Sequence, residues 1–165
     1  MTSTELIIAY SFSNLVAVCL LILAFKRPVT ARLLFSLLFL WAAVTNATTA
    51  WKNPQVYLEY ADYSPFTFLD NIITGPFSEH ITVYVLLIAL GQLCIAVFLS
   101  FKGWLTKIAL TGAIIFLLAI TPLGIGTAFP CPLIMAIACY VLLKKQAPFS
   151  LWDILSKKLL KGKIT

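Results

Sequence analysis

Charged residues are scarce in this sequence. Of its 165 residues, 11% are charged and 61% are hydrophobic, and the mean hydropathy is +0.99. Water-soluble domains are about 45–50% apolar and about one quarter charged. The chain therefore has too little polar surface to enclose a soluble core, and its composition predicts an all-α integral membrane protein. At about 20 residues per crossing, it has room for four or five spans and for no separate soluble domain.

The sequence also lacks the common motifs of metal and thiol–disulfide sites. It has one histidine, His80, and four cysteines, with no His-x-x-x-His, Cys-x-x-Cys or Glu-x-x-His pattern. One histidine cannot build a typical zinc site without other ligands. Three cysteines fall in apolar segments, and only Cys131 is expected at the outer boundary, where no second cysteine could pair with it. These absences argue against a bound metal and against a disulfide-exchange enzyme.

Long uncharged stretches define the membrane-spanning segments. The longest covers residues 108–143, and its 36 positions would make a single helix far longer than the roughly 30 Å of membrane hydrocarbon. Prolines and glycines in residues 121–132 predict a turn that divides this stretch in two. The sequence thus predicts a bundle, residues 1–148, with five spans at residues 6–25, 33–50, 81–101, 104–121 and 130–143.

The distribution of basic residues predicts the orientation of these spans. With the N-terminus outside and the C-terminus in the cytoplasm, 11 of the 12 basic residues lie inside and only Lys52 lies outside. An excess of lysine and arginine on the cytoplasmic side sets membrane-protein orientation. A four-span alternative would place the basic C-terminal tail on the side opposite Lys102 and Lys107. We therefore expect five spans, with the N-terminus out and the C-terminus in.

Residues 51–80 form the one sizeable connection outside the membrane, and we expect them to make a lid on the outer mouth of the bundle. Asn53 and Pro54 predict the start of a short helix that ends near residue 63. A second short amphipathic helix is expected over residues 66–74, ending at Gly75-Pro76, after which Ser78 is expected to cap the third span. Aromatic residues are dense here, as is typical of segments at the level of the lipid headgroups.

Polar side chains within the spans are the best candidates for an internal site, because in a bilayer they seek partners. Asn14, Asn46 and Gln92 are expected in the outer half or near mid-depth, where a cavity beneath the lid could collect them together with His80. The alternative is that they only bond helix to helix. Asp70, Glu79 and His80 could bring chemistry to the lid, or form part of a solvated outer face. The candidate ligand-binding residues are Asn14, Asn46, Asp70, Glu79, His80, Gln92 and Cys131.

The C-terminal tail, residues 149–165, is expected to be an amphipathic helix. Ser150 and Asp153 approximate a capping box, and leucines recur every four residues beside four lysines. Such a helix lies on the anionic cytoplasmic face of a membrane. Nucleic-acid binding is the less favoured interpretation of this basic tail.

From Arg32 to about Lys145 the order of elements resembles the DoxX-like family of small bacterial membrane proteins. The likeness rests on residues 32–42 (RLLFSLLFLWA), residues 53–61 (NPQVYLEYA) and the run from Leu90-Gly91-Gln92-Leu93 to Lys102-Gly103. Many members carry a glutamate where this chain has Gln92. The resemblance implies a four-helix pattern in a bacterial inner membrane, and some members are subunits of a thiosulfate:quinone oxidoreductase.

Two functions are expected from these observations. The first is a non-enzymatic accessory subunit that binds a small hydrophobic ligand, a lipid or a partner protein through an outward-facing cavity, with no cofactor. The alternative is a membrane redox component that passes electrons to quinone with a periplasmic or soluble partner. A transporter would need a polar path across the membrane, and the inner halves of the spans have few polar groups.

Overall fold

The computed structural model describes residues 3–63, 65–145 and 150–152. Within these ranges the chain is helical and has no strand, which confirms the predicted all-α class. The long helices are α1 (Ser3–Lys26), α2 (Pro28–Lys52), α5 (Ile81–Leu99), α6 (Trp104–Ile120) and α7 (Cys131–Lys145). The short segments are η1 (Pro54–Leu58), α3 (Glu59–Tyr63), α4 (Thr67–Ile72), η2 (Ile73–Phe77) and η3 (Thr121–Thr127).

In the part of the chain that the structure describes, four helices are long and apolar enough to cross a membrane, which indicates a multi-pass membrane protein. They are Thr4–Lys26, Pro28–Lys52, Ile81–Leu99 and Trp104–Thr127, the last of which includes η3. Each begins and ends within six residues of a predicted span. The helix over the predicted fifth span, α7, has 15 residues, which corresponds to about 22 Å at 1.5 Å per residue.

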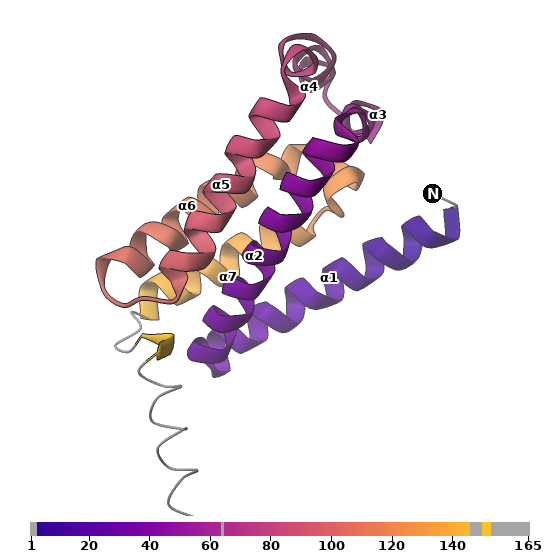
Figure 1. Cartoon of the computed structure of the whole chain (residues 1–165). Coiled ribbons are helices and arrows are strands. Elements are labelled where there is room, and N and C mark those ends of the chain that lie inside the picture. Colours follow the sequence, from indigo (N-terminus) through magenta and orange to yellow (C-terminus); the bar gives the residue numbers. More distant parts are fainter. Residues whose placement is uncertain (1–2, 64, 146–149, 153–165) are drawn as a thin grey trace, which may run out of the picture.

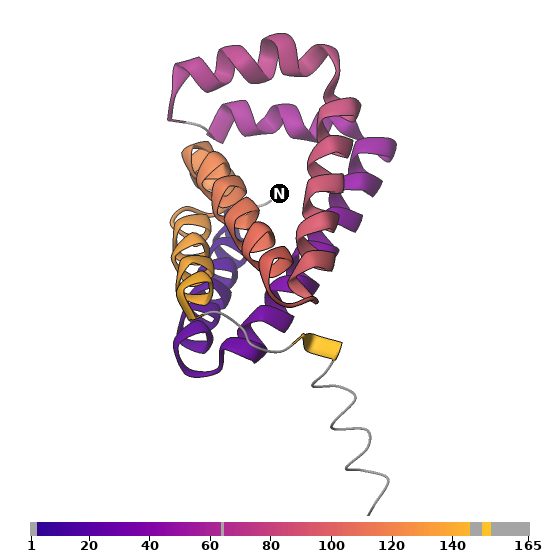
Figure 2. The ribbon, with the colours of Figure 1, turned by 90° about the vertical axis from the view of Figure 1, so that its left-hand side faces the viewer.

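The long helices form two layers that meet at one end and diverge toward the other (Figures 1 and 2). In one layer α2 packs along α5, and in the other α7 packs against both α1 and α6. Two tight turns join the layers at the end where they meet. The first lies between α1 and α2, and the second, residues 100–103, lies between α5 and α6.

Both turns follow from local sequence. Pro28 begins α2 and disfavours helical geometry in the preceding residue, and Arg27 accordingly has φ −140° and ψ 71°. Gly103 precedes α6 with φ +72° and ψ −133°, a conformation that L-residues with a side chain rarely adopt. The turns therefore reverse the chain within a few residues and fix the layers to each other.

Small side chains allow the helices of the second layer to approach closely. Ala17 and Ala24 of α1 and Ala138 and Cys139 of α7 are fully buried in the main core. Large apolar side chains instead cover much of the outer surface; Ile7, Leu87 and Ile115 are each about 60% exposed. This arrangement is typical of membrane bundles, where small residues mediate helix contacts and apolar side chains face lipid.

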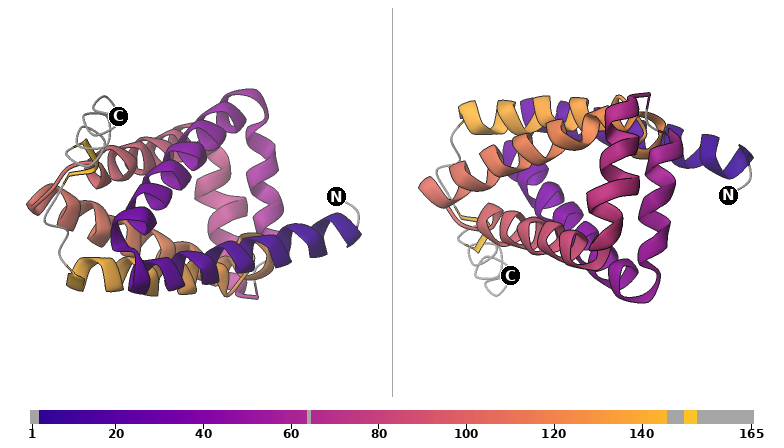
Figure 3. Two further views of the ribbon diagram at one scale, coloured as in Figure 1. Left: turned by 90° about the horizontal axis from the view of Figure 1, so that it is seen from below. Right: turned by 90° about the horizontal axis from the view of Figure 1, so that it is seen from above.

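The segment between α2 and α5 lies across the open end of the bundle, where α3 and α4 run side by side (Figures 2 and 3). We call η1, α3, α4 and η2 the lid, and the end of the bundle that they cover the lid end. Tyr57, Leu58 and Phe77 of the lid pack against a small buried cluster at the facing ends of α2 and α5. The predicted lid of two short helices is therefore present, and Gly75 interrupts the second one with φ −97° and ψ −111°.

One detail of the predicted capping is wrong. Ser78 does not cap α5, because its hydroxyl donates to the carbonyl oxygens of Thr74 and Gly75, 2.7 Å away. His80 holds the N-cap position of α5 instead, without a capping hydrogen bond from its side chain. Asn53 does precede Pro54 at the start of η1, but its side chain makes no capping bond either.

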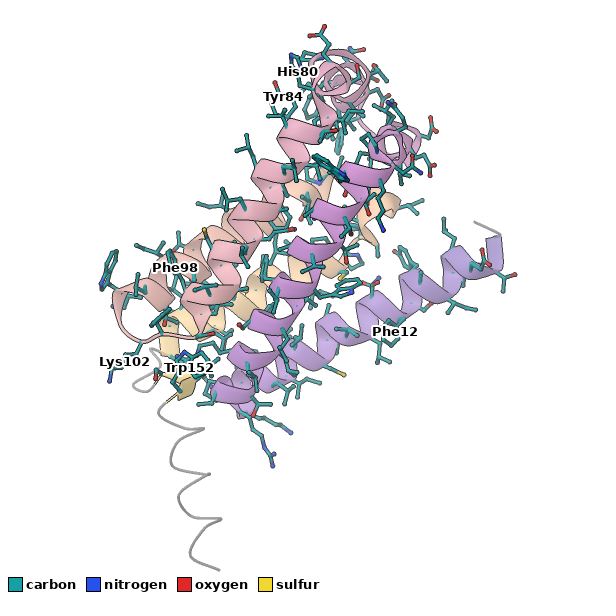
Figure 4. The ribbon with its side chains drawn as sticks, in the orientation of Figure 1. Phe12, His80, Tyr84, Phe98, Lys102 and Trp152 are labelled. Atoms are coloured by element: carbon teal, nitrogen blue, oxygen red, sulfur yellow. The ribbon has the colours of Figure 1, made fainter. Side chains whose placement is uncertain are left out.

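Basic side chains gather at the end opposite the lid, which we call the basic end. Figure 4 shows Lys102 there and His80 at the lid end. Among the described residues, Lys52 is the one lysine or arginine at the lid end. The basic end carries Lys26, Arg27, Arg32, Lys102, Lys107, Lys144 and Lys145.

The beginning of the C-terminal tail contacts the basic end. Ser150 and Leu151 are buried, and the Leu151 amide donates to the Ser100 carbonyl at 3.1 Å. Trp152 follows and is 61% exposed. The rest of the predicted amphipathic helix, residues 153–165, lies outside the described residues.

Candidate functional site

A cavity of about 550 Å³ lies between the two layers beneath the lid. All five long helices contribute to its wall. Leu38, Phe39 and Ala42 line it from α2, and Cys131 and Met135 line it from α7. The lid and η3 complete it. A volume of this size falls within the range of small-molecule binding sites. The cavity therefore arises where the layers diverge and the lid bridges them.

The wall of the cavity is apolar and uncharged. Aromatic, aliphatic and small side chains make up most of it, and none of the described lining residues is Asp, Glu, Lys, Arg or His. An ion would enter such a space without a counter-charge, at a high desolvation cost. The composition of the wall favours a neutral, mainly apolar occupant.

A chain of hydrogen bonds forms the polar part of the wall. The Tyr57 hydroxyl, from the lid, donates to Asn46 Oδ1 at 2.9 Å. Asn46 Nδ2, on α2, donates to Gln92 Oε1, on α5, at 2.8 Å. Gln92 is 3% exposed. These bonds connect the lid to the two helices of the first layer.

Tyr57 and Tyr60 bring phenol groups from the lid to the cavity, and their rings stack with centroids 6.3 Å apart. Burial raises the pKa of the Tyr60 phenol above 10.0, and the nearby Glu59 carboxylate raises it further. Burial and Tyr60 also raise the pKa of Tyr57, an effect that a hydrogen bond with Thr49 opposes. Both phenols are therefore neutral at physiological pH and can donate hydrogen bonds.

The cavity has a lateral border between α1 and α2, two helices that diverge from their junction toward the lid end (Figure 1). Phe12 of α1 and Trp41 of α2 line it and are 66% and 68% exposed. Side chains that line a cavity and are also largely exposed mark a route to the outside. On this side the cavity therefore borders the surroundings of the apolar helices.

The structure brings together three of the residues proposed from sequence. Asn46 and Gln92 form the polar part of the wall, and Cys131 lines it from α7 and is 7% exposed. Asn14 does not line the cavity, although its neighbour Ser13 does. The Asn14 amide instead donates to the carbonyl oxygens of Tyr10 and Ala128, each 3.0 Å away, and so joins α1 to the end of η3.

The remaining three lie outside the cavity. His80 and Glu79 are exposed where the lid meets α5, so the expected grouping of His80 with Asn46 and Gln92 does not occur. Asp70 is half-buried on α4, and its Oδ1 atom is buried without a hydrogen bond from any described residue. The described residues contain no group of three or more His, Cys, Asp or Glu side chains that could hold a metal ion.

Sequence reasoning did not identify the lid tyrosines or the lateral border as parts of the site. Tyr57 and Tyr60 are three positions apart, a spacing that puts two side chains on one face of a helical segment. That pattern could have indicated that both face the bundle. Phe12 and Trp41 carry no such signal, because the spans contain many other large apolar side chains.

Comparisons of the chain with protein-family models, with curated proteins and with solved structures find no match.

Proposed function

We propose that this multi-pass membrane protein binds a small, neutral, hydrophobic molecule in the cavity beneath the lid. The observation that carries the proposal is a 550 Å³ space whose described wall is uncharged and mainly apolar, with a single polar cluster around Asn46 and Gln92. Ligand sites commonly combine an apolar wall with a few polar groups that orient the ligand. In this proposal the chain is a binder or an accessory subunit.

We further propose that the ligand arrives from the membrane. Phe12 and Trp41 border the cavity and are largely exposed on helices whose outer surfaces are apolar. A molecule dissolved in lipid could pass between α1 and α2 without crossing the lid. This route suits a lipid or another poorly water-soluble compound.

The proposed topology has five crossings, with the lid outside and the basic end in the cytoplasm. Two features support it. The described basic residues apart from Lys52 gather at one end, as expected for a cytoplasmic side, and α7 packs against α1 and α6 as part of the same layer. The resemblance to the DoxX-like family supports placement in a bacterial inner membrane.

Native mass spectrometry of the protein released from mild detergent tests the binding proposal. We expect a retained mass of a few hundred daltons above that of the chain, and extraction followed by lipid analysis would identify it. An isoprenoid quinone among the extracted molecules would favour the alternative, a redox component. A chain without any retained molecule, even after incubation with membrane lipid extract, would contradict binding.

A further inference from the structure

Gln92 has an unused hydrogen-bond donor at the cavity. Its Oε1 atom accepts from Asn46, whereas its Nε2 atom donates to no described residue. Nε2 is not among the polar atoms that are both fully enclosed and without a hydrogen bond, so part of its surface is accessible. Gln92 itself lines this cavity, and it also lines a smaller hollow between α5 and α6.

The direction of the hydrogen bonds determines which atom of Gln92 remains available. Tyr57 donates to Asn46 Oδ1, and Asn46 Nδ2 donates to Gln92 Oε1. The orientation of each amide follows from its neighbour in this chain. The last member, Gln92, consequently presents an N–H group.

Two hydroxyl donors in the wall are already used. Ser13 donates to the Ala9 carbonyl, and Thr127 donates to the carbonyls of Ile120 and Gly124. Tyr60 contributes a further phenol beside Tyr57. Gln92 and Tyr60 therefore offer hydrogen-bond donors to the cavity, and no described lining residue is charged.

We propose that the cavity selects an uncharged amphiphile with a carbonyl-type hydrogen-bond acceptor, which pairs with the Gln92 Nε2 group. An unmet N–H group in an apolar space is costly, and a ligand acceptor would satisfy it. A hydrocarbon of the same size would leave it unmet. A carboxylate would offer an acceptor but would bring a charge that no described lining residue balances. This inference rests on the proposed binding function and names the ligand class.

Trp41 allows a site-specific test in lipid vesicles, because it lines the cavity. Trp51, Trp104 and Trp152 are replaced by phenylalanine, and energy transfer is measured from Trp41 to pyrene probes in phosphatidylcholine vesicles. The three probes are 1-decanoylpyrene, which has a ketone, 1-decylpyrene, which lacks it, and 10-(pyrenyl)decanoate, which is charged. A chain with Trp104 alone, at the basic end, reports non-specific transfer.

We expect saturable transfer from Trp41 for both neutral probes, with the ketone binding about three- to tenfold more tightly, as one added hydrogen bond implies. In Gln92→Met, which keeps the length of the side chain without its N–H group, this preference should fall. Saturable transfer from Trp41 to 1-decylpyrene reports that the cavity of the variant is formed, and the ketone preference is taken as the ratio of the two affinities within each chain. Ser36→Ala is the control, since Ser36 is a buried polar residue of α2 outside the cavity.

Each other outcome has a distinct meaning. Equal saturable binding of the two neutral probes by the chain with Gln92 would overturn the acceptor inference and leave the proposed function standing. The same ketone preference in Gln92→Met would overturn the role of Gln92. Decanoate binding as tight as that of the ketone would overturn selection for an uncharged molecule. Without saturable transfer from Trp41 to any probe, the proposed function itself would fail.

Discussion

Asn46 of α2 donates a hydrogen bond of 2.8 Å to Gln92 of α5, and this bond joins the two helices of one layer at the wall of the cavity. Tyr57 donates to the same Asn46 side chain from the lid. The pair therefore holds α2 against α5 and also orients the N–H group of Gln92.

The first of these roles can be measured by a double-mutant cycle. Asn46→Leu and Gln92→Leu should each lower the free energy of unfolding by about 1–3 kcal/mol, because the first leaves the buried Gln92 amide and the second the half-buried Asn46 amide without its partner. The double variant should recover part of this loss, with a coupling energy of about 0.6–2 kcal/mol. Unfolding in mild detergent measures both quantities. Strictly additive losses would indicate that the two side chains do not interact.

The turn at Gly103 provides a prediction about the fold. Gly103→Ala should destabilise the protein by about 1–3 kcal/mol, because the residue adopts φ +72° and ψ −133°. Gly91→Ala is the matched control, since Gly91 lies within α5 and a Cβ atom there would meet nothing within 4 Å. That control should be neutral or up to about 1 kcal/mol more stable. Equal effects on the thermal unfolding midpoint would contradict this account of the turn.

The topology can be tested by cysteine labelling. In a chain whose four cysteines are replaced by alanine, single cysteines are placed at Glu79, Arg27 and Lys144, all exposed positions. In right-side-out membrane vesicles, an impermeant maleimide should label the cysteine at 79 and should reach those at 27 and 144 only after permeabilisation. Labelling at 144 but not at 27 in sealed vesicles would mean that α7 does not cross.

The lid tyrosines predict a dependence on alkaline pH. The pKa values of Tyr57 and Tyr60 are raised above 10.0 in the folded chain, so folding disfavours their ionisation. Their contribution to stability is complete below pH 10 and is lost as the pH rises through the folded pKa values. Tyrosinate absorbance at 295 nm should show a late phase that decreases in Tyr60→Phe. An unchanged titration in that variant would contradict the burial of this phenol.

The helices could be predicted from the sequence because each break has a strong local cause. Charges or Pro-Gly segments end the apolar runs, and the turn expected within residues 121–132 appears where α6 ends at Ile120 and α7 begins at Cys131. Capping was predicted less well. Ser78 finds carbonyl partners in the preceding turn, so the start of α5 falls two residues later, after His80.

The site could be predicted only in part. Asn46 and Gln92 were grouped because a cavity that opens outward beneath the lid would collect polar residues between the outer end and mid-depth, and depth follows from span boundaries. His80 was expected with them, yet it lies where the lid joins α5, and the way the lid folds is a tertiary property. Asn14 has a suitable depth, but it bonds to Ala128 in a turn whose shape hydropathy does not determine.

Filling the cavity tests its proposed role as a binding site most directly. Ala42 lines the cavity, whereas Ala119 is an exposed alanine of α6 outside it. Native mass spectrometry should detect the same retained molecule on the unmodified chain and on Ala119→Trp, and should find it lost or at least tenfold depleted on Ala42→Trp. Retention of that molecule by a folded Ala42→Trp at the level of the unmodified chain would contradict the account.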